Sequence, residues 1–117
     1  MFALNPSLCV YLHRDPIDFR AGVNGLCGIV EHALKLDPFA PACFVFSNKR
    51  RDRIKLLFWH RNGFWLCAKR LQQERFVWPR SDEAVLTLSA EQLHWLLDGV
   101  DLAALRGHRA LQYRQAS

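Results

Sequence analysis

Acidic side chains are nearly absent from the centre of this 117-residue chain. Residues 49–80 contain ten of the sixteen lysines and arginines but only two acids, Asp52 and Glu74, so this segment has a local charge of +8. The segments before and after it are slightly acidic, at −1 and −2. A surface that serves only solubility usually mixes both signs of charge. Positive charge concentrated in one segment instead predicts a polyanionic partner.

The chain also lacks a long apolar run and closely spaced cysteines. No segment approaches the roughly 20 apolar residues of a membrane-spanning helix, and residues 1–10 have neither the basic start nor the apolar run of a signal peptide. The four cysteines, at positions 9, 27, 43 and 67, lack the paired spacing of a zinc site. We therefore expect a protein of the reducing cytoplasm, with reduced thiols and no cofactor.

Sequence patterns typical of enzymes are weak. The stretch GVNGLCG lacks the G-x-G-x-x-G order of a phosphate-binding loop, and no serine lies in a nucleophile-elbow context. The five histidines are scattered, and no three carboxylates are placed for two-metal chemistry. His60, beside the basic face, leaves a small nuclease or RNA-processing enzyme that uses His60 with nearby arginines as an alternative. We expect a protein that is not an enzyme.

The length and the apolar content of 50% are those of one domain. We place it in residues 1–105, followed by a flexible basic tail in residues 106–117. Residue spacing predicts one helix from an N-cap at Asp18 to about Leu34. A second helix follows a capping box of Ser89 and Gln92 and ends at Gly99. Alternating apolar residues predict strands at 8–12, 43–47, 53–60, 64–70, 75–78 and 86–88.

These elements predict the α+β class. We expect an antiparallel meander sheet of four to five strands, with the two helices packed on one face. Two of the strands form a hairpin, for which a three-residue loop at 61–63 is preferred over a two-residue Asn-Gly turn, which would mix the two faces. The preferred register puts three pairs on one face: Trp59 with Trp65, Leu57 with Cys67, and Lys55 with Lys69.

The basic hairpin is the candidate nucleic-acid-binding site. Like charges directly opposite each other on a sheet are unfavourable unless something neutralises them, and a phosphate backbone does so while tryptophans stack on bases. The alternative is that the tryptophans belong to the core and the cations only keep the turns soluble. The candidate residues are Lys49, Arg50, Arg51, Arg53, Lys55, Trp59, Arg61, Trp65, Lys69, Arg70 and Arg75.

Several motifs, in a consistent order, carry a family resemblance. The chain resembles the TnpB-type accessory protein of the insertion-sequence-sixty-six transposon family in DFRAGVNGL, FVFSNKRRDRIKLLFW, GFWLCAKRL, ERFVWP and SAEQLHWLLDGVD. The match spans about residues 8 to 101. The resemblance implies a helper that does not cut DNA and that assists a separately encoded transposase. With the basic hairpin, it leads us to expect element-end DNA as a second partner.

The resemblance also carries over particular positions. In the first-helix region they are Asp18, Arg20 and Gly22, and in the basic region they are Asn48, Arg50, Arg51, Asp52, Arg53, Lys55, Trp59, Gly63, Lys69, Arg70, Arg75, Trp78 and Pro79. The chain departs from the family pattern at Ala21, where lysine is common, and at His60, where aspartate is common. The second change weakens any metal site there. A different hypothesis stays open, in which the domain docks the transposase or a second copy without touching DNA.

Overall fold

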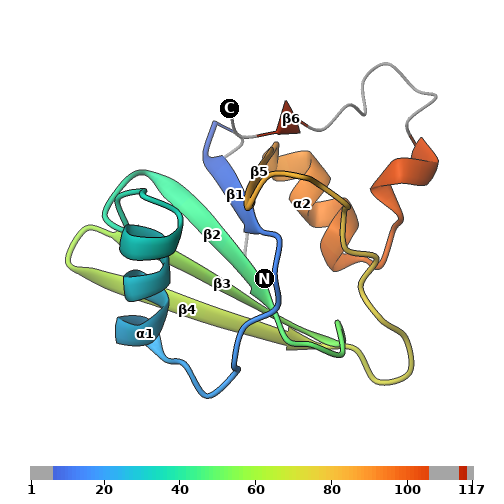
Figure 1. Ribbon diagram of the computed structural model, residues 1–117, viewed down its shortest axis with the longest axis horizontal. Helices are drawn as coiled ribbons and strands as arrows, with labels where there is room; N and C mark the ends of the chain where they lie inside the picture. The colour runs from blue at the N-terminus through green and yellow to red at the C-terminus, as the bar shows by residue number, and fades with distance from the viewer. Residues whose placement is uncertain (1–6, 106–113, 116–117) are drawn as a thin grey trace.

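The computed structural model describes residues 7–105 and 114–115, which contain one six-stranded sheet (Figure 1). The strands are β1 (Cys9–His13), β2 (Ala42–Ser47), β3 (Arg53–His60), β4 (Gly63–Arg70), β5 (Val85–Leu88) and the two-residue β6 (Arg114–Gln115). The helical elements are α1 (Val23–Gly28), a π-helical turn (Ile29–Ala33), α2 (Ala90–Leu97) and a 3-10 helix (Leu102–Leu105). Residues 106–113 and 116–117 of the predicted tail lie outside the described residues. None of the described helices is long and apolar enough to span a membrane.

The strand order is β4-β3-β2-β1-β5-β6. β1 and β2 pair in parallel, and residues 14–41, which contain α1, form the crossover that a parallel pair requires. β2, β3 and β4 form an antiparallel meander, while β5 pairs antiparallel with the other side of β1. The predicted α+β class, with four to five main strands, is confirmed, and the sheet is mixed rather than wholly antiparallel.

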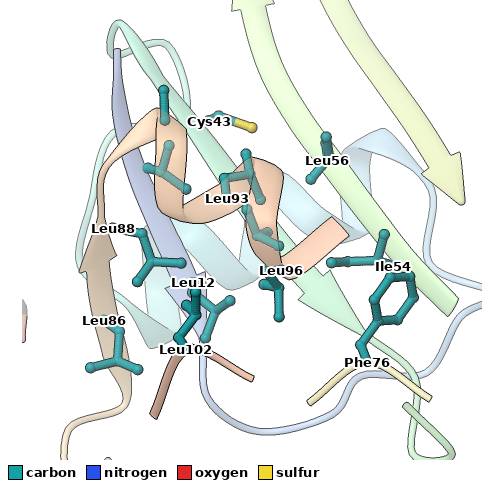
Figure 2. Packing of buried hydrophobic residues seen from close by; sticks show 13 residues of the cluster. Leu12, Cys43, Ile54, Leu56, Phe76, Leu86, Leu88, Leu93, Leu96 and Leu102 are labelled. Carbon is teal, nitrogen blue, oxygen red and sulfur yellow. The ribbon is translucent and has the colours of Figure 1, made fainter. Parts of the chain in front are cut away.

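The two helices pack on opposite faces of the sheet, so the predicted arrangement of both helices on one face is wrong. Phe44 and Phe46 of β2 belong to the apolar cluster under α1, and Cys43 and Val45 belong to the cluster under α2. Figure 2 shows the second cluster, in which side chains of α2 meet those of the sheet. Every residue of β2 is buried, because a strand that is covered on both faces has no side exposed to solvent.

The first helix begins later than the sequence predicts. Its N-cap is Gly22, not Asp18, and its first residue is Val23. The Asp18 carboxylate instead accepts hydrogen bonds from the backbone N–H and the guanidinium of Arg20, and these bonds lower the pKa of Asp18 to about 2. The backbone carbonyls of Phe19 and Ala21, which precede the helix, accept hydrogen bonds from the Lys55 ammonium.

The second helix begins as predicted. The Ser89 hydroxyl accepts a hydrogen bond from the Gln92 backbone N–H at 3.0 Å, and the Gln92 side-chain oxygen accepts one from the Ser89 N–H at 2.8 Å. Gly99 adopts a φ of 84° just after the helix, a conformation that favours glycine. The predicted capping box and the predicted end of the helix are both confirmed.

Ser89→Ala should lower the free energy of unfolding by about 1 kcal/mol, because the N-cap acceptor is lost. Urea denaturation of the full chain measures this change. Ser89→Asp is the matched control, since aspartate is also a good N-cap acceptor and should keep most of the stability. Equal losses of unfolding free energy in Ser89→Ala and Ser89→Asp would contradict a capping role for Ser89.

The predicted strand at 75–78 is wrong, because residues 71–84 form an irregular segment. The backbone N–H of Leu71 donates to the Asp52 carbonyl at 2.8 Å, and that of Phe76 donates to the Arg51 carbonyl at 2.7 Å. The Phe76 side chain is buried in the α2 cluster. The segment therefore binds a turn instead of extending the sheet, and β4 remains an edge strand.

Candidate nucleic-acid interface

The β3–β4 turn contains two residues, Arg61 and Asn62, and sets a register that differs from both registers considered above. His60 pairs with Gly63, and the Asn62 N–H donates to the His60 carbonyl at 2.6 Å. Arg61 itself adopts a φ of 56°. A positive φ is uncommon outside glycine, which is why the sequence assigned the left-handed conformation to Gly63 instead.

This register separates the two tryptophans that were expected to share a face. Trp59 pairs with Phe64, which belongs to the α1 side of the sheet, whereas Trp65 pairs with Phe58, which belongs to the α2 side. A shift of one residue moves every side chain of a strand to the other face. The predicted cross-strand pairs Trp59 with Trp65, Leu57 with Cys67, and Lys55 with Lys69 are therefore wrong.

The two tryptophans have different surroundings. The Trp59 ring is half-buried and packs edge-on against Phe39 and Phe64, with centroid distances of 5.0 and 5.1 Å. The Trp65 ring stacks on Phe58 at 6.4 Å and is 55% exposed. Trp59 thus belongs to an aromatic cluster beside the α1 layer, and Trp65 presents an apolar surface to solvent.

Lys55 fixes the chain that precedes α1. Its ammonium donates hydrogen bonds to the backbone carbonyls of Phe19 at 2.7 Å and Ala21 at 2.9 Å. The same ammonium lies 4.5 Å from the centroid of the Phe19 ring. These contacts engage the charge within the fold, so Lys55 has a structural role that its neighbours in the sequence do not predict.

Lys55→Met should lower the free energy of unfolding by about 1–3 kcal/mol, since two carbonyls lose a charged donor while the aliphatic stem is kept. Urea denaturation tests this expectation, with Lys49→Met, on an exposed turn, as the control that should leave stability unchanged. DNA affinity of Lys55→Met should stay within about twofold of the unsubstituted chain, because the lost charge is already engaged. Unchanged stability of Lys55→Met with a large loss of DNA affinity would contradict this structural role and would make Lys55 part of the DNA-binding surface.

Lys69 also makes a contact within the fold. Its ammonium donates to the Leu97 carbonyl at 2.7 Å, at the C-terminal end of α2. The C-terminal end of a helix carries partial negative charge, which favours a cation there. Lys69 therefore links the edge strand β4 to α2.

Arg51 joins three segments of the chain. Its guanidinium donates to the Ser47 hydroxyl at 2.5 Å and to the Arg14 carbonyl at 3.0 Å, and it lies 4.9 Å from the centroid of the Trp78 ring. Burial lowers the pKa of this guanidinium, and the nearby Asp15 partly offsets the effect. The contacts make Arg51 a clamp between β1, β2 and the irregular segment 71–84.

Asn48 organises the turn between β2 and β3. Its side-chain oxygen accepts hydrogen bonds from the backbone N–H groups of Asp52 and Arg53, and its amide nitrogen donates to the Asp52 carboxylate at 2.6 Å. The hydrogen bond from Asn48 is the main cause of the lowered pKa of Asp52. A turn held in this way presents its two tip residues, Lys49 and Arg50, to solvent in a fixed arrangement.

Exposed cations from three segments meet around this turn. Arg53 and Arg70 are direct cross-strand partners at the end of the hairpin, and the backbone hydrogen bonds of residues 71–76 to the turn bring Arg75 to the same region. We call this surface the basic end; it consists of Lys49, Arg50, Arg53, Arg70 and Arg75. Arg61 lies at the opposite end of the hairpin, so it is not part of this surface.

Charge at the basic end is only partly compensated. The two carboxylates of this part of the chain are Asp52, which is held by Asn48 and lies 3.9 Å from Arg50, and the exposed Glu74. Within residues 7–105, Arg53 and Arg70 form no ion pair. The arrangement can therefore bind an anionic surface through several cations at once.

The fold and the site together define a small α+β domain with a basic end to its sheet. The chain belongs to the family described as IS66 Orf2-like protein, whose pattern matches residues 8–107. Membership of this family implies an accessory role in the transposition of an insertion sequence. The resemblance seen in the sequence is thereby confirmed.

Two relatives come from Sinorhizobium fredii (strain NBRC 101917 / NGR234). The uncharacterized protein y4jC is 35% identical over 101 residues, which is 86% of each chain. The uncharacterized protein y4hO is 34% identical over 92 residues, which is 79% of this chain and 80% of the relative. No solved structure matches the chain significantly.

Proposed function

We propose that this accessory protein binds DNA through the basic end of its sheet and assists a separately encoded transposase without catalysing a reaction itself. The observation that carries the proposal is the grouping of five exposed cations from three segments at one end of the sheet. Phosphate contacts of this kind fix the position of a protein on DNA and do not read its sequence.

Two features of the basic end suit a phosphate backbone. Arg53 and Arg70 lie directly opposite each other, and like charges in that position are unfavourable until an anion neutralises them. The Asn48 hydrogen bonds hold the turn in one conformation, so little order has to be gained on binding. Element-end DNA is the expected target, since the family acts in transposition.

A salt series on labelled duplex and single-stranded DNA tests the proposal. If about five phosphate contacts form, the logarithm of the binding constant should fall with the logarithm of the salt concentration at a slope of about −4 to −5 on duplex DNA. The absence of binding at low salt would reject direct DNA contact and leave the transposase as the partner to test.

A second function is favoured by the surface around Trp65. A groove of about 250 Å³ is lined by apolar side chains such as Ile54, Leu56 and Leu97, and by the polar or charged Lys69, His94 and Asp98. Trp65 lies on the same face of β4 as Cys67, which also lines the groove. In this alternative the transposase docks on the groove and on Trp65. This alternative predicts a complex with the transposase that persists at high salt and is weakened by Trp65→Ser. DNA binding at the basic end predicts neither the salt resistance nor the effect of Trp65→Ser.

A further inference from the structure

Three arginines that are far apart in the sequence line one open hollow. The hollow has a volume of about 440 Å³ and lies where β1 ends, beside the β2–β3 turn. Its volume is in the range of roughly 300–1,000 Å³ that is typical of ligand pockets. The lining residues are Arg14, Arg51, Trp78, Pro79, Arg80 and Ser81.

The walls of the hollow are held by hydrogen bonds. The Arg14 guanidinium donates to the Asp15 carboxylate at 3.0 Å and to the Asp82 carbonyl at 3.0 Å. The Trp78 indole N–H donates to the His13 carbonyl at 3.1 Å, and Arg51 lies over its ring. These contacts position Arg14, Arg51 and Trp78 before any ligand arrives, and the exposed Arg80 adds a further guanidinium to the hollow.

The charges around the hollow are not balanced. Asp15 neutralises Arg14, and Asp82 and Glu83 add weaker attraction to the same guanidinium. Among the described residues, neither Arg51 nor Arg80 has an ion-pair partner, and the acceptors bound by Arg51 are neutral oxygens. A cation that is half-buried without a carboxylate is stabilised when an anion binds beside it.

The chemistry of these groups selects the anion. Guanidinium groups present a planar fork of N–H donors that matches the oxygens of phosphate. The Ser81 hydroxyl accepts a hydrogen bond from the Glu83 N–H at 2.9 Å, so its own hydrogen is available as a further donor. Two cations without an ion-pair partner favour a group with close to two negative charges, which a phosphate monoester carries near neutral pH.

We propose that this hollow binds a phosphate monoester, with Arg80, Arg51 and Ser81 as its donors. The group can belong to the 5′ end of a DNA strand or to a free nucleotide. Only the first source rests on the proposed DNA-binding function. The hollow adjoins the turn that carries Lys49 and Arg50, so a bound strand end would continue onto the basic end.

The test is a titration of the full chain with inorganic phosphate at constant ionic strength, followed by the NMR signal of the Trp78 indole N–H. We expect a saturable shift that weakens at least fivefold in Arg80→Gln, an exposed position. Lys35→Gln, an exposed cation outside the hollow, removes the same charge and should leave the titration unchanged. A shift that does not saturate, or that both variants weaken equally, would overturn the proposal.

Two further arms identify the source of the phosphate. Tighter binding of a 5′-phosphorylated duplex than of its 5′-hydroxyl counterpart, with the difference lost in Arg80→Gln, supports a strand end. Tighter binding of deoxyadenosine monophosphate than of inorganic phosphate, with equal binding of the 5′-phosphorylated and 5′-hydroxyl duplexes, supports a free nucleotide. Arg53→Gln/Arg70→Gln should leave the phosphate titration unchanged. The phosphate titration therefore tests the hollow alone, and duplex DNA binding by this double variant tests the basic end alone.

Discussion

Replacing Arg53 and Arg70 together by glutamine should weaken duplex DNA binding roughly 50- to 100-fold at about 0.1 M salt, because each lost phosphate contact removes close to one released counterion. For the same reason the log–log salt slope should become less steep by about 2. Glutamine keeps most of the side-chain length, so the two positions change mainly in charge. A fluorescence anisotropy titration at several salt concentrations gives both numbers.

The matched control for this variant is Lys35→Gln/Arg61→Gln. It removes the same two charges from exposed positions outside the basic end. If only the net charge of +5 mattered, both double variants would lose affinity equally, and the assignment to the basic end would be wrong. The melting temperature of Arg53→Gln/Arg70→Gln should stay the same or rise slightly, because two like charges no longer face each other.

Arg51→Ala should lower the free energy of unfolding by about 2–4 kcal/mol, through the loss of two hydrogen bonds from a charged donor and of the contact with the Trp78 ring. The Ser47 hydroxyl is buried, so it loses a partner that water does not readily replace. The irregular segment 71–84 should also loosen, because Trp78 rests on Arg51. Urea denaturation measures the change in stability, and amide exchange of Phe76 reports on the segment.

The neighbouring Arg50→Ala is the control for Arg51→Ala. The Arg50 side chain is 76% exposed and lies 3.9 Å from Asp52, so its removal should change stability by less than about 0.5 kcal/mol. Similar stability in both variants would contradict the clamp assigned to Arg51. The difference in stability between the two variants also matters for DNA binding. If Arg51→Ala is partly unfolded, its DNA affinity must be calculated for the folded fraction alone.

Elements that depend on neighbouring residues followed from the sequence. The capping box of Ser89 and Gln92 and the stop at Gly99 involve groups within a few positions of each other, so local hydrogen bonding decides them. β3 has the predicted bounds, because alternation of apolar residues along a strand is a local pattern. The concentration of positive charge in residues 49–80 is likewise a property of the chain itself.

Features that depend on long-range contacts needed the tertiary structure. Lys55 looked like a free cation until the fold placed the carbonyls of residues 19 and 21 at its ammonium. Arg14 was not a candidate at all, because nothing near it in the sequence relates it to Arg51, which lies 37 positions away. The unexpected positive φ of Arg61 reversed the expected faces of a whole strand.

The sequence by itself determined the class of fold, the capped second helix, the family and the segment that carries the charge. Only the tertiary structure decided which of those charges are free, since the same cations serve either as hydrogen-bond donors to distant carbonyls or as exposed groups. A one-residue change in register reverses the face of every side chain in a strand, and such a change depends on one dihedral angle in a turn. Composition records how many cations a segment has, and packing decides which of them remain available to a partner.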